Sequence, residues 1–593
     1  IDGSINNMGH MGGSFFSPSF TEYDFGEIGE ITSTKNWTLF NYRETSITID
    51  DIVFSTPSFT SNTQFPLIIE PLETGIITLN CLPQTMGIIQ DSLTFQSLDV
   101  AQDAIIELSA IGVQGNVLSG AISGNLNSDV YRISGSININ EDDTLVINPG
   151  TQFLFDGAYD FIINGVLISE GTQQDSIIFD NYNQGDSLLW SQWRGLTISN
   201  QISESILKYV RISGAFKENG DGGAIHLLNS NINIDYSVIS NNVAENAAGI
   251  YSSYSNIILT NSIINNNYVF PIGYGTGGGI KLHYSDGSLS NLEIINNSAN
   301  AGAGIYLHYS DPILTQINIS NNYAYGLGGG IYMKASEAQL DQIIIENNHA
   351  EDGGGIRMYE SNPILRNITI YQNTANWNGG GVFLRNSNPL LENVIISNNI
   401  AHSKGGGIYF YFDSELSEQS SEILISDNYS EGHGGGIFIS TNSNISLNNT
   451  TITSNRVGEG DVFGAGIYAD GGVTTKLINS IVYNNRRDGD SGINYNLNGY
   501  TGNIFNEYDI SYSNIEGETD WIPNGIGIIS EDPLFADSDY GDYSLQASSP
   551  CIDSGTADID QDGVSDLFDY YGDAPDMGAY EFEFEILFGD LNQ

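Results

Sequence analysis

The chain has 593 residues, and its 72 acidic and 17 basic side chains give it a formal net charge of −55. Nucleic acids and anionic membrane surfaces are bound through basic patches, so this charge argues against both as partners. Hydrophobic residues make up 40% of the chain, which excludes an intrinsically disordered protein, and no apolar run is long enough to predict a membrane span.

The first part of the chain is predicted to be a flexible lead-in followed by a β-sandwich. Residues 1–18 are rich in glycine, serine and methionine, and from 19 to 113 short alternating segments recur at intervals of roughly ten residues. The phrases FGEIGE, NWTLFN, EPLETG and IELSAIGV follow one another there. This order resembles immunoglobulin-like modules of the ASPM–SPD-2–Hydin type, and the resemblance implies a spacer or docking module.

A repeat dominates the next region, 114–545. A glycine-rich phrase such as GGGIY or GAGIY returns at spacings of 25 to 30 residues. The branched residues that close these phrases are Ile225, Ile250, Ile280, Ile305, Ile331, Ile356, Val382, Ile408, Ile437 and Ile467. Each unit then alternates apolar and polar residues and ends in an asparagine pair, and none holds a helical pattern.

Such units cannot bury an apolar face alone, so they are predicted to stack as coils of a right-handed parallel β-helix with two or three short strands per coil. The branched residue and the residue two positions later would point inward, as in the columns Ile305, Ile331 and Leu307, Met333. The asparagine pairs would form an amide ladder at a coil corner.

The glycine–isoleucine–aromatic phrase with its asparagine pair resembles the repeats of polymorphic outer-membrane proteins and other secreted right-handed β-helix surface proteins. The fold class predicted for the whole chain is therefore all-β, with an immunoglobulin-like sandwich before a long right-handed parallel β-helix. The resemblance implies a secreted or cell-surface protein of bacterial type. It leaves the activity open, because this fold carries lyases, hydrolases, adhesins and stalks.

The positions one and three after each branched residue should point outward, and they collect exposed aromatic and basic side chains on one face. Aromatic faces stack on sugar rings and cations pair with carboxylates, so the face is a candidate glycan-binding surface. Its candidate residues are Tyr306, Tyr332, Tyr359, Phe383, Arg385, Tyr409 and Tyr411. The alternative is structural, because such side chains also stack with one another on parallel sheets.

A second alternative for this face is catalysis. The resemblance to β-helix polysaccharide lyases implies a lysine or arginine base, a proton donor and often calcium. The residues that could carry this role are Lys281, His283, His308, Lys334 and Arg357. No paired carboxylates recur at matching coil positions, as a glycosidase would need.

Residues 546–584 are predicted to form a cap with a calcium loop. The phrases DPLF, SPCIDSG and DMGAYE around this segment resemble the choice-of-anchor Q segment of secreted β-helix proteins. The predicted calcium ligands, at positions 1, 3, 5, 7, 9 and 12 of a loop with Gly563 at position 6, are Asp558, Asp560, Asp562, Val564, Asp566 and Asp569. The alternative is a solvated acidic turn. Residues 585–593 resemble the start of a dockerin-like module.

These patterns predict a secreted or cell-surface protein with an adhesive or structural role, whose partner would be an extracellular polysaccharide or a cell-surface molecule. A calcium-assisted polysaccharide lyase, or another polysaccharide-active enzyme, is the alternative. A self-assembling subunit of an extracellular filament is the second alternative.

Overall fold

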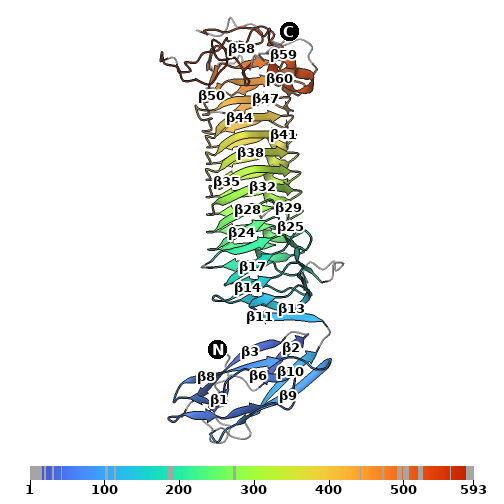
Figure 1. The fold of residues 1–593 in the computed structure, drawn as a ribbon. Helices are drawn as coiled ribbons and strands as arrows, with labels where there is room; N and C mark the ends of the chain where they lie inside the picture. Colours follow the sequence, from blue (N-terminus) through green and yellow to red (C-terminus); the bar gives the residue numbers. More distant parts are fainter. Residues whose placement is uncertain are drawn as a thin grey trace, which may run out of the picture.

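The computed structural model is a β-rod with a sandwich at its N-terminal end and an irregular segment at its C-terminal end (Figure 1). It describes residues 16–18, 22–29, 32–41, 43–99, 105–112, 115–182, 192–201, 203–270, 275–440, 442–470, 473–489, 497, 507–517, 525–560 and 562–582. Most of the predicted lead-in and all of 585–593 lie outside the described residues. No helix among the described residues is long and apolar enough to cross a membrane.

The N-terminal unit is a sandwich of two four-stranded sheets, with strand orders β1-β3-β8-β6 and β2-β10-β9-β5. Its strands are β1 (Phe16–Pro18), β2 (Glu22–Ile28), β3 (Ser33–Asn41), β4 (Ile47–Ile49), β5 (Asp51–Val53), β6 (Phe59–Ser61), β7 (Leu67–Ile69), β8 (Thr74–Cys81), β9 (Gly87–Gln96) and β10 (Ile105–Gly112). Alternating residues bury Trp37, Leu39 and Ile77 between the sheets, as the period-2 pattern predicted.

The rod is a parallel β-helix, and a 34-stranded sheet wraps around most of it. Its strands before the glycine repeats are β11 (Asn116–Ala121), β12 (Gly124–Leu126), β13 (Val130–Ile139), β14 (Thr144–Ile147), β15 (Gln152–Phe155), β16 (Phe161–Ile163), β17 (Val166–Glu170), β18 (Ile177–Asn181), β19 (Leu196–Ser199), β20 (Ser205–Lys208) and β21 (Val210–Ser213). The strands that follow the glycine phrases are β23 (Ile225–Leu228), β27 (Ile250–Ser253), β31 (Ile280–His283), β34 (Ile305–His308), β37 (Ile331–Lys334), β40 (Ile356–Tyr359), β43 (Val382–Arg385), β46 (Ile408–Tyr411), β49 (Ile437–Ile439) and β53 (Ile467–Ala469).

The second strands of the coils complete this sheet. They are β24 (Asn231–Asp235), β25 (Val238–Ser240), β28 (Asn256–Thr260), β29 (Ile263–Asn265), β32 (Gly287–Ile295), β35 (Ile313–Ser320), β38 (Gln339–Glu346), β41 (Ile364–Tyr371), β44 (Leu390–Ser397), β47 (Ser421–Ser426), β51 (Thr450–Thr453), β55 (Ile481–Tyr483) and β58 (Asn514–Ile515). A short separate sheet holds β50 (Ile445–Asn448), β54 (Thr474–Ile478) and β57 (Glu507–Ser511).

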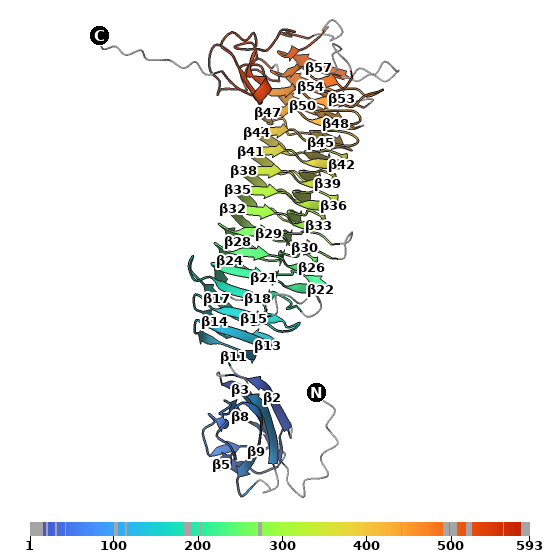
Figure 2. The ribbon, with the colours of Figure 1, turned by 90° about the vertical axis from the view of Figure 1, so that its right-hand side faces the viewer.

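An eleven-stranded parallel sheet forms another side of the rod, where its strands stack coil on coil (Figure 2). Its strands are β22 (Phe216–Asp221), β26 (Val243–Asn246), β30 (Tyr268–Val269), β33 (Ser298–Ala301), β36 (Tyr323–Leu327), β39 (His349–Asp352), β42 (Thr374–Asn378), β45 (Ile400–Ala401), β48 (Tyr429–Ser430), β52 (Arg456–Val457) and β56 (Arg486–Arg487).

One coil, from Ile331 to Gly355, shows how the repeat folds. It contains β37, β38 and β39, which agrees with the predicted two or three strands. The chain turns in the left-handed backbone region at Ala335, Gln342, Asn347 and Gly353, with φ between 50° and 70°. Gln342 bends β38, so this coil turns four corners with three strands. The branched residue of each coil pairs in register with those of the coils before and after it.

Both predicted inward columns are confirmed. Ile305, Ile331, Leu307 and Met333 are fully buried and belong to one continuous core along the rod. The glycine run lets the coils approach closely, because a Cβ on Gly355 would lie 2.7 Å from the carbonyl oxygen of Gly381 in the next coil.

The asparagine ladder is also confirmed. The second residue of each pair is buried, and its Nδ2 donates to Oδ1 of the equivalent asparagine one coil later, at 2.9 to 3.1 Å. The first residue of the pair, such as Asn321 or Asn347, turns the corner with a positive φ. The first residue therefore forms the bend, and the second forms hydrogen bonds between neighbouring coils.

A serine ladder, which was not predicted, links neighbouring coils by hydrogen bonds at a second corner. The backbone N–H of one serine donates to Oγ of the serine in the next coil, at 3.0 or 3.1 Å. Its members are Ser230, Ser255, Ser285, Ser310, Ser336, Ser361 and Ser387. Each lies five residues after the branched residue of its coil, so the period was visible in the sequence.

The C-terminal segment folds back along the side of the last coils. It includes the hairpin β59 (Phe535–Asp537) and β60 (Asp542–Leu545) and a short 3₁₀ turn, Ser538–Tyr540. The Tyr543 hydroxyl donates to Asp427 at 2.8 Å, and the Ala579 N–H donates to the Thr451 hydroxyl at 2.9 Å. Met577 packs on Ile481 of the rod. The segment therefore covers a flank of several coils as well as following the last one.

Candidate functional site: the stacked face and the acidic loop

The residues directly after the branched residues form a column that we call the first outward column. Its members are His226, Tyr251, Lys281, Tyr306, Tyr332, Arg357, Phe383, Tyr409, Phe438 and Tyr468. They point away from the core, as predicted, but seven of the ten are buried instead of exposed. Ala301, Leu327 and Tyr359 pack over Tyr306 and Tyr332, for example. Alternation predicts the direction of a side chain, and it does not predict what covers it.

Every neighbouring pair in the first outward column is in ring or cation–ring contact. Phe383, Tyr409, Phe438 and Tyr468 stack with centroids 4.9 to 5.0 Å apart. The Lys281 ammonium lies between the rings of Tyr251 and Tyr306, at 5.2 and 5.7 Å. The contacts His226–Tyr251 and Tyr306–Tyr332 continue the column. The ring faces are thus used within the protein.

Arg357 takes the place of a ring in the same column. Its guanidinium carbon lies 5.8 Å from the centroid of Tyr332 and 4.3 Å from that of Phe383. The guanidinium also forms an ion pair with Asp352 at 3.3 Å. Burial lowers the pKa of Lys281, with no more than a partial offset from Asp221. Both cations are therefore packing members of the column, which leaves them poorly placed to act on a ligand.

The second outward column, two residues further on, is more accessible. It holds His283, His308, Lys334, Tyr359, Arg385 and Tyr411. His283 and His308 stack with centroids 5.0 Å apart, and Arg385 lies between the rings of Tyr359 and Tyr411. Burial and the nearby Lys334 lower the pKa of His308 to about 4, so this imidazole is neutral at pH 7.

Of the five candidate catalytic residues, the structure brings the two histidines together and places Lys334 beside His308 in the next coil. It keeps Lys281 and Arg357 in the first outward column, between rings.

Three exposed tyrosines beside this face were not predicted. Tyr254, Tyr284 and Tyr309 lie at a coil corner with φ between 46° and 50°. They stack nearly parallel, with centroids 4.8 to 5.1 Å apart and interplanar angles of 7°. Tyrosine four residues after Ile250, Ile280 and Ile305 was the signal in the sequence. The facing surfaces of these three rings cover one another.

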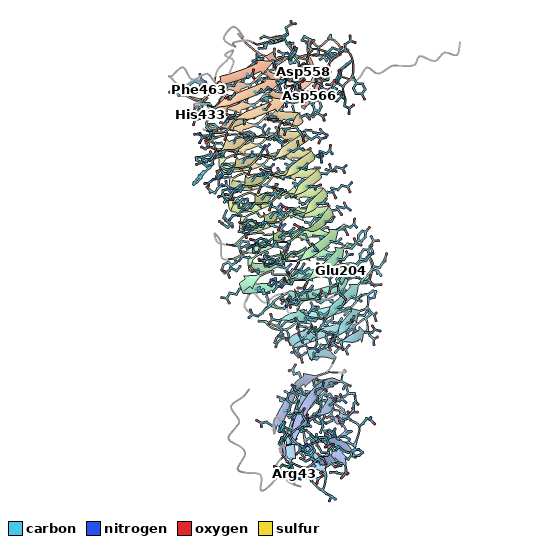
Figure 3. All side chains as sticks on the ribbon, turned by 90° about the vertical axis from the view of Figure 1, so that its left-hand side faces the viewer. Arg43, Glu204, His433, Phe463, Asp558 and Asp566 are labelled. Carbon is cyan, nitrogen blue, oxygen red and sulfur yellow. The ribbon has the colours of Figure 1, made fainter. Side chains whose placement is uncertain are left out.

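The acidic loop gathers three of its predicted ligands at the C-terminal end of the rod. One carboxylate oxygen from each of Asp558, Asp560 and Asp566 lies within 4.8 Å of the others, and Figure 3 shows Asp558 and Asp566 close together, away from His433. Asp562 and Asp569 are not part of this group. Three converging carboxylates offer the hard oxygen ligands that calcium prefers, so the residues fit such an ion.

Backbone amides hold the shape of the acidic loop. The N–H groups of Asp562 and Gly563 donate to the Asp558 carboxylate at 3.1 and 2.9 Å. The N–H of Ile559 donates to Asp566 at 2.8 Å. These bonds orient the two carboxylates on one side of the loop.

The comparison with solved structures finds distant likenesses. A protein of unknown function from Porphyromonas gingivalis W83 is 18% identical over 16% of this chain and 46% of its own, with a TM-score of 0.15. The ASH/PapD-like domain 7 of human CEP192 is 11% identical over 17% of this chain and 88% of its own, also with a TM-score of 0.15. The chain thus spans less than half of the first protein. Neither likeness carries an argument. No curated protein matches the chain.

The family comparison covers the rod. The model described as "Right handed beta helix region" matches residues 198–355, 272–417, 303–486 and 365–531. These overlapping matches extend over more than half of the chain, and they coincide with the coils and ladders described above. The chain belongs to the right-handed β-helix region family.

Proposed function

We propose that the chain is a secreted or cell-surface rod of bacterial type with an adhesive or structural role. The observation that carries this proposal is the unbroken first outward column, which uses aromatic rings and two cations as packing between coils. The N-terminal sandwich is proposed as an immunoglobulin-like spacer. The glycine–isoleucine repeats are proposed to be of the polymorphic outer-membrane-protein type, and the C-terminal segment to be of the choice-of-anchor Q type.

A polysaccharide-active enzyme is the second candidate, and one observation favours it. His308 is neutral at pH 7, partly accessible, and next to Lys334 on a face that a polymer could reach. A neutral imidazole can accept a proton, which elimination from a uronate would require. Against this role, the two other cations of the proposed set pack between aromatic rings.

Incubation with neutral and acidic polysaccharides, with and without calcium, separates the two functions. We expect no new reducing ends and no unsaturated ends, because the cations of the face serve as packing. New ends that disappear in both His308→Ala and Lys334→Ala would make the protein an enzyme and overturn the proposed role. Exposed Arg366→Ala is the matched control, since Arg366 pairs with Glu392 on another face.

We also propose calcium as a structural ligand of the acidic loop. Isothermal titration calorimetry should detect calcium binding to the full chain. Asp560→Ala should abolish the heat of binding at this loop, because it removes one of three converging carboxylates. Asp539→Ala is the control, since Asp539 is exposed in the 3₁₀ turn outside the loop. Equal calcium binding by wild type and Asp560→Ala would leave the loop as a solvated acidic turn.

A further inference from the structure

The outer face of the eleven-stranded sheet carries several exposed apolar side chains. Four large apolar side chains on or next to its strands are well exposed: Phe270 at 37%, Tyr323 at 42%, Trp377 at 59% and Ile400 at 37%. The inner face is lined by small buried residues, among them the alanines of the strands. This sheet runs along the rod, so its outer face is long and narrow (Figure 2).

Trp377 is unlike the other described tryptophans. Trp37 and Trp193 are completely buried, whereas Trp377 exposes more than half of its surface. Within the described residues, its indole has no ring partner and no cation over it, in contrast to the stacked residues of the first outward column. A planar apolar surface of this size is thus available to a ligand.

A β-bulge holds Trp377 outward. Ala350 pairs with Ala375 and Asp352 with Asn378, so Asn376 and Trp377 together face the single residue Glu351. The Trp377 carbonyl accepts the Ser403 N–H of the next coil at 2.8 Å, which fixes the backbone of the bulge.

A sister bulge shows that the fold does not need this side chain. Two coils earlier, Ala299 pairs with Ala324 and Ala301 with Leu327, so Tyr325 and Gly326 face Asn300 in the same way. Gly326 there holds the place that Trp377 holds later. Since glycine suffices to form the bulge, the indole is available for a purpose other than folding.

Polar groups that can bind hydroxyls lie in the coil of Trp377 and in nearby coils. Asn376 donates to Glu351 at 3.4 Å, and His402 contacts Glu431 at 2.8 Å on the adjoining coils. Tyr323 stacks on His349 and has an edge contact with the Tyr325 ring at 4.9 Å, and its other neighbour in the column is the small Ser298. Tyr323 and Trp377 are two coils apart, or about 10 Å along the rod from the strand spacing.

The charges near Trp377 favour a neutral ligand. The Glu351 carboxylate faces the bulge that holds Trp377, Glu431 lies two coils further along the rod, and the whole chain carries a net charge of −55. Lys404, paired with Asn378 across the coils, directs its ammonium to the Phe438 ring at 4.7 Å, on the first outward column. Carboxylate and amide groups accept and donate hydrogen bonds to sugar hydroxyls, whereas a polyuronate would be repelled.

From these observations we infer that the outer face of the eleven-stranded sheet binds a neutral, extended polysaccharide, with Trp377 as the stacking platform and Tyr323 as a second contact. This inference rests on the proposed adhesive role and gives it a ligand class. It moves the glycan-binding surface from the stacked face, where ring faces are covered, to a sheet where an indole is free.

Affinity electrophoresis of the full chain tests this surface. The gels contain a β-glucan, a xylan or a mannan as neutral polymers, and polygalacturonate or alginate as acidic polymers. We expect retardation by at least one neutral polymer, and a loss of affinity of at least about tenfold in Trp377→Gly. Phe412→Ala should stay within about twofold of wild type, because Phe412 is similarly exposed, at 45%, and follows β46 on a different side of the rod.

Thermal melting of Trp377→Gly should match that of wild type, as the glycine of the sister bulge indicates. Equal retardation of Trp377→Gly and wild type, retardation by acidic polymers alone, or none by any neutral polymer would each overturn the inference. Reducing and unsaturated ends of the polysaccharides are measured in the same samples. New ends would overturn the proposed function, while the retardation of Trp377→Gly relative to wild type would still decide whether this face is the binding surface.

Discussion

Replacing Asn373 by alanine is expected to lower the free energy of unfolding by roughly 3–6 kcal/mol. Asn373 lies in the middle of the asparagine ladder and is fully buried. Its Nδ2 lies 2.8 to 3.1 Å from the oxygens of Ile345, Tyr371 and Asn399. Its Oδ1 accepts two bonds from Asn348. Alanine would leave the Asn348 N–H and the Ile345 carbonyl buried without these partners.

Urea unfolding followed by circular dichroism measures this effect as a lower transition midpoint. Asn318→Ala is the matched control, because the Oδ1 of Asn318 has no hydrogen-bond partner and the side chain belongs to the same repeat. The control should change stability by less than about 1 kcal/mol. Hydrogen exchange should show the loss of protection in the coils next to Asn373, since each coil contacts only its neighbours. Equal midpoints for Asn373→Ala and Asn318→Ala would show that the ladder contributes little.

The sequence predicted the coils well because a stacked repeat turns a period in sequence into a column in space. The positions that Ile331 and Met333 hold point inward in the neighbouring coils as well, and the second asparagine of each pair lies at the same corner of its coil. The serine ladder obeys the same rule, with Ser336 five residues after Ile331. It was missed because serine at a turn also has a local explanation.

The residues that cover the outward side chains could not be predicted from the period of the repeat. Tyr306 and Tyr332 point outward, as expected, but residues at the ends of β33 and β36 and the second outward column lie over them. The fold-back of the C-terminal segment onto Asp427 and Thr451 joins residues more than a hundred positions apart, and no local pattern marks such a contact.

The β-bulge at Trp377 left only a weak trace in the sequence, in the spacing of the repeats. The spacing between Ile356 and Val382 is 26 residues, one more than between Ile331 and Ile356. That extra residue could have been placed in any turn of the coil. The strand register locates it in the eleven-stranded sheet, opposite Glu351. The candidate glycan contact thus became visible only when the register was known.

Replacing Arg357 by alanine is expected to cost about 2–4 kcal/mol of stability, because Arg357 packs between two rings and neutralises a mostly buried acid. Its side chain is 8% exposed and that of Asp352 is 15% exposed. Alanine would remove the contacts with Tyr332 and Phe383 and leave the Asp352 carboxylate with a neutral partner, Asn378, at 3.1 Å. A denaturant midpoint measures the loss.

Two further variants test whether the column needs a flat group more than a charge. Arg366→Ala breaks an exposed ion pair with Glu392 and should cost no more than about 1 kcal/mol. The double variant Arg357→Phe with Asp352→Asn should recover much of the loss of Arg357→Ala, since a ring occupies the equivalent place in most other coils. Unchanged stability in Arg357→Ala would instead mean that the guanidinium is not a packing member, and the arginine would regain its place as a candidate ligand contact.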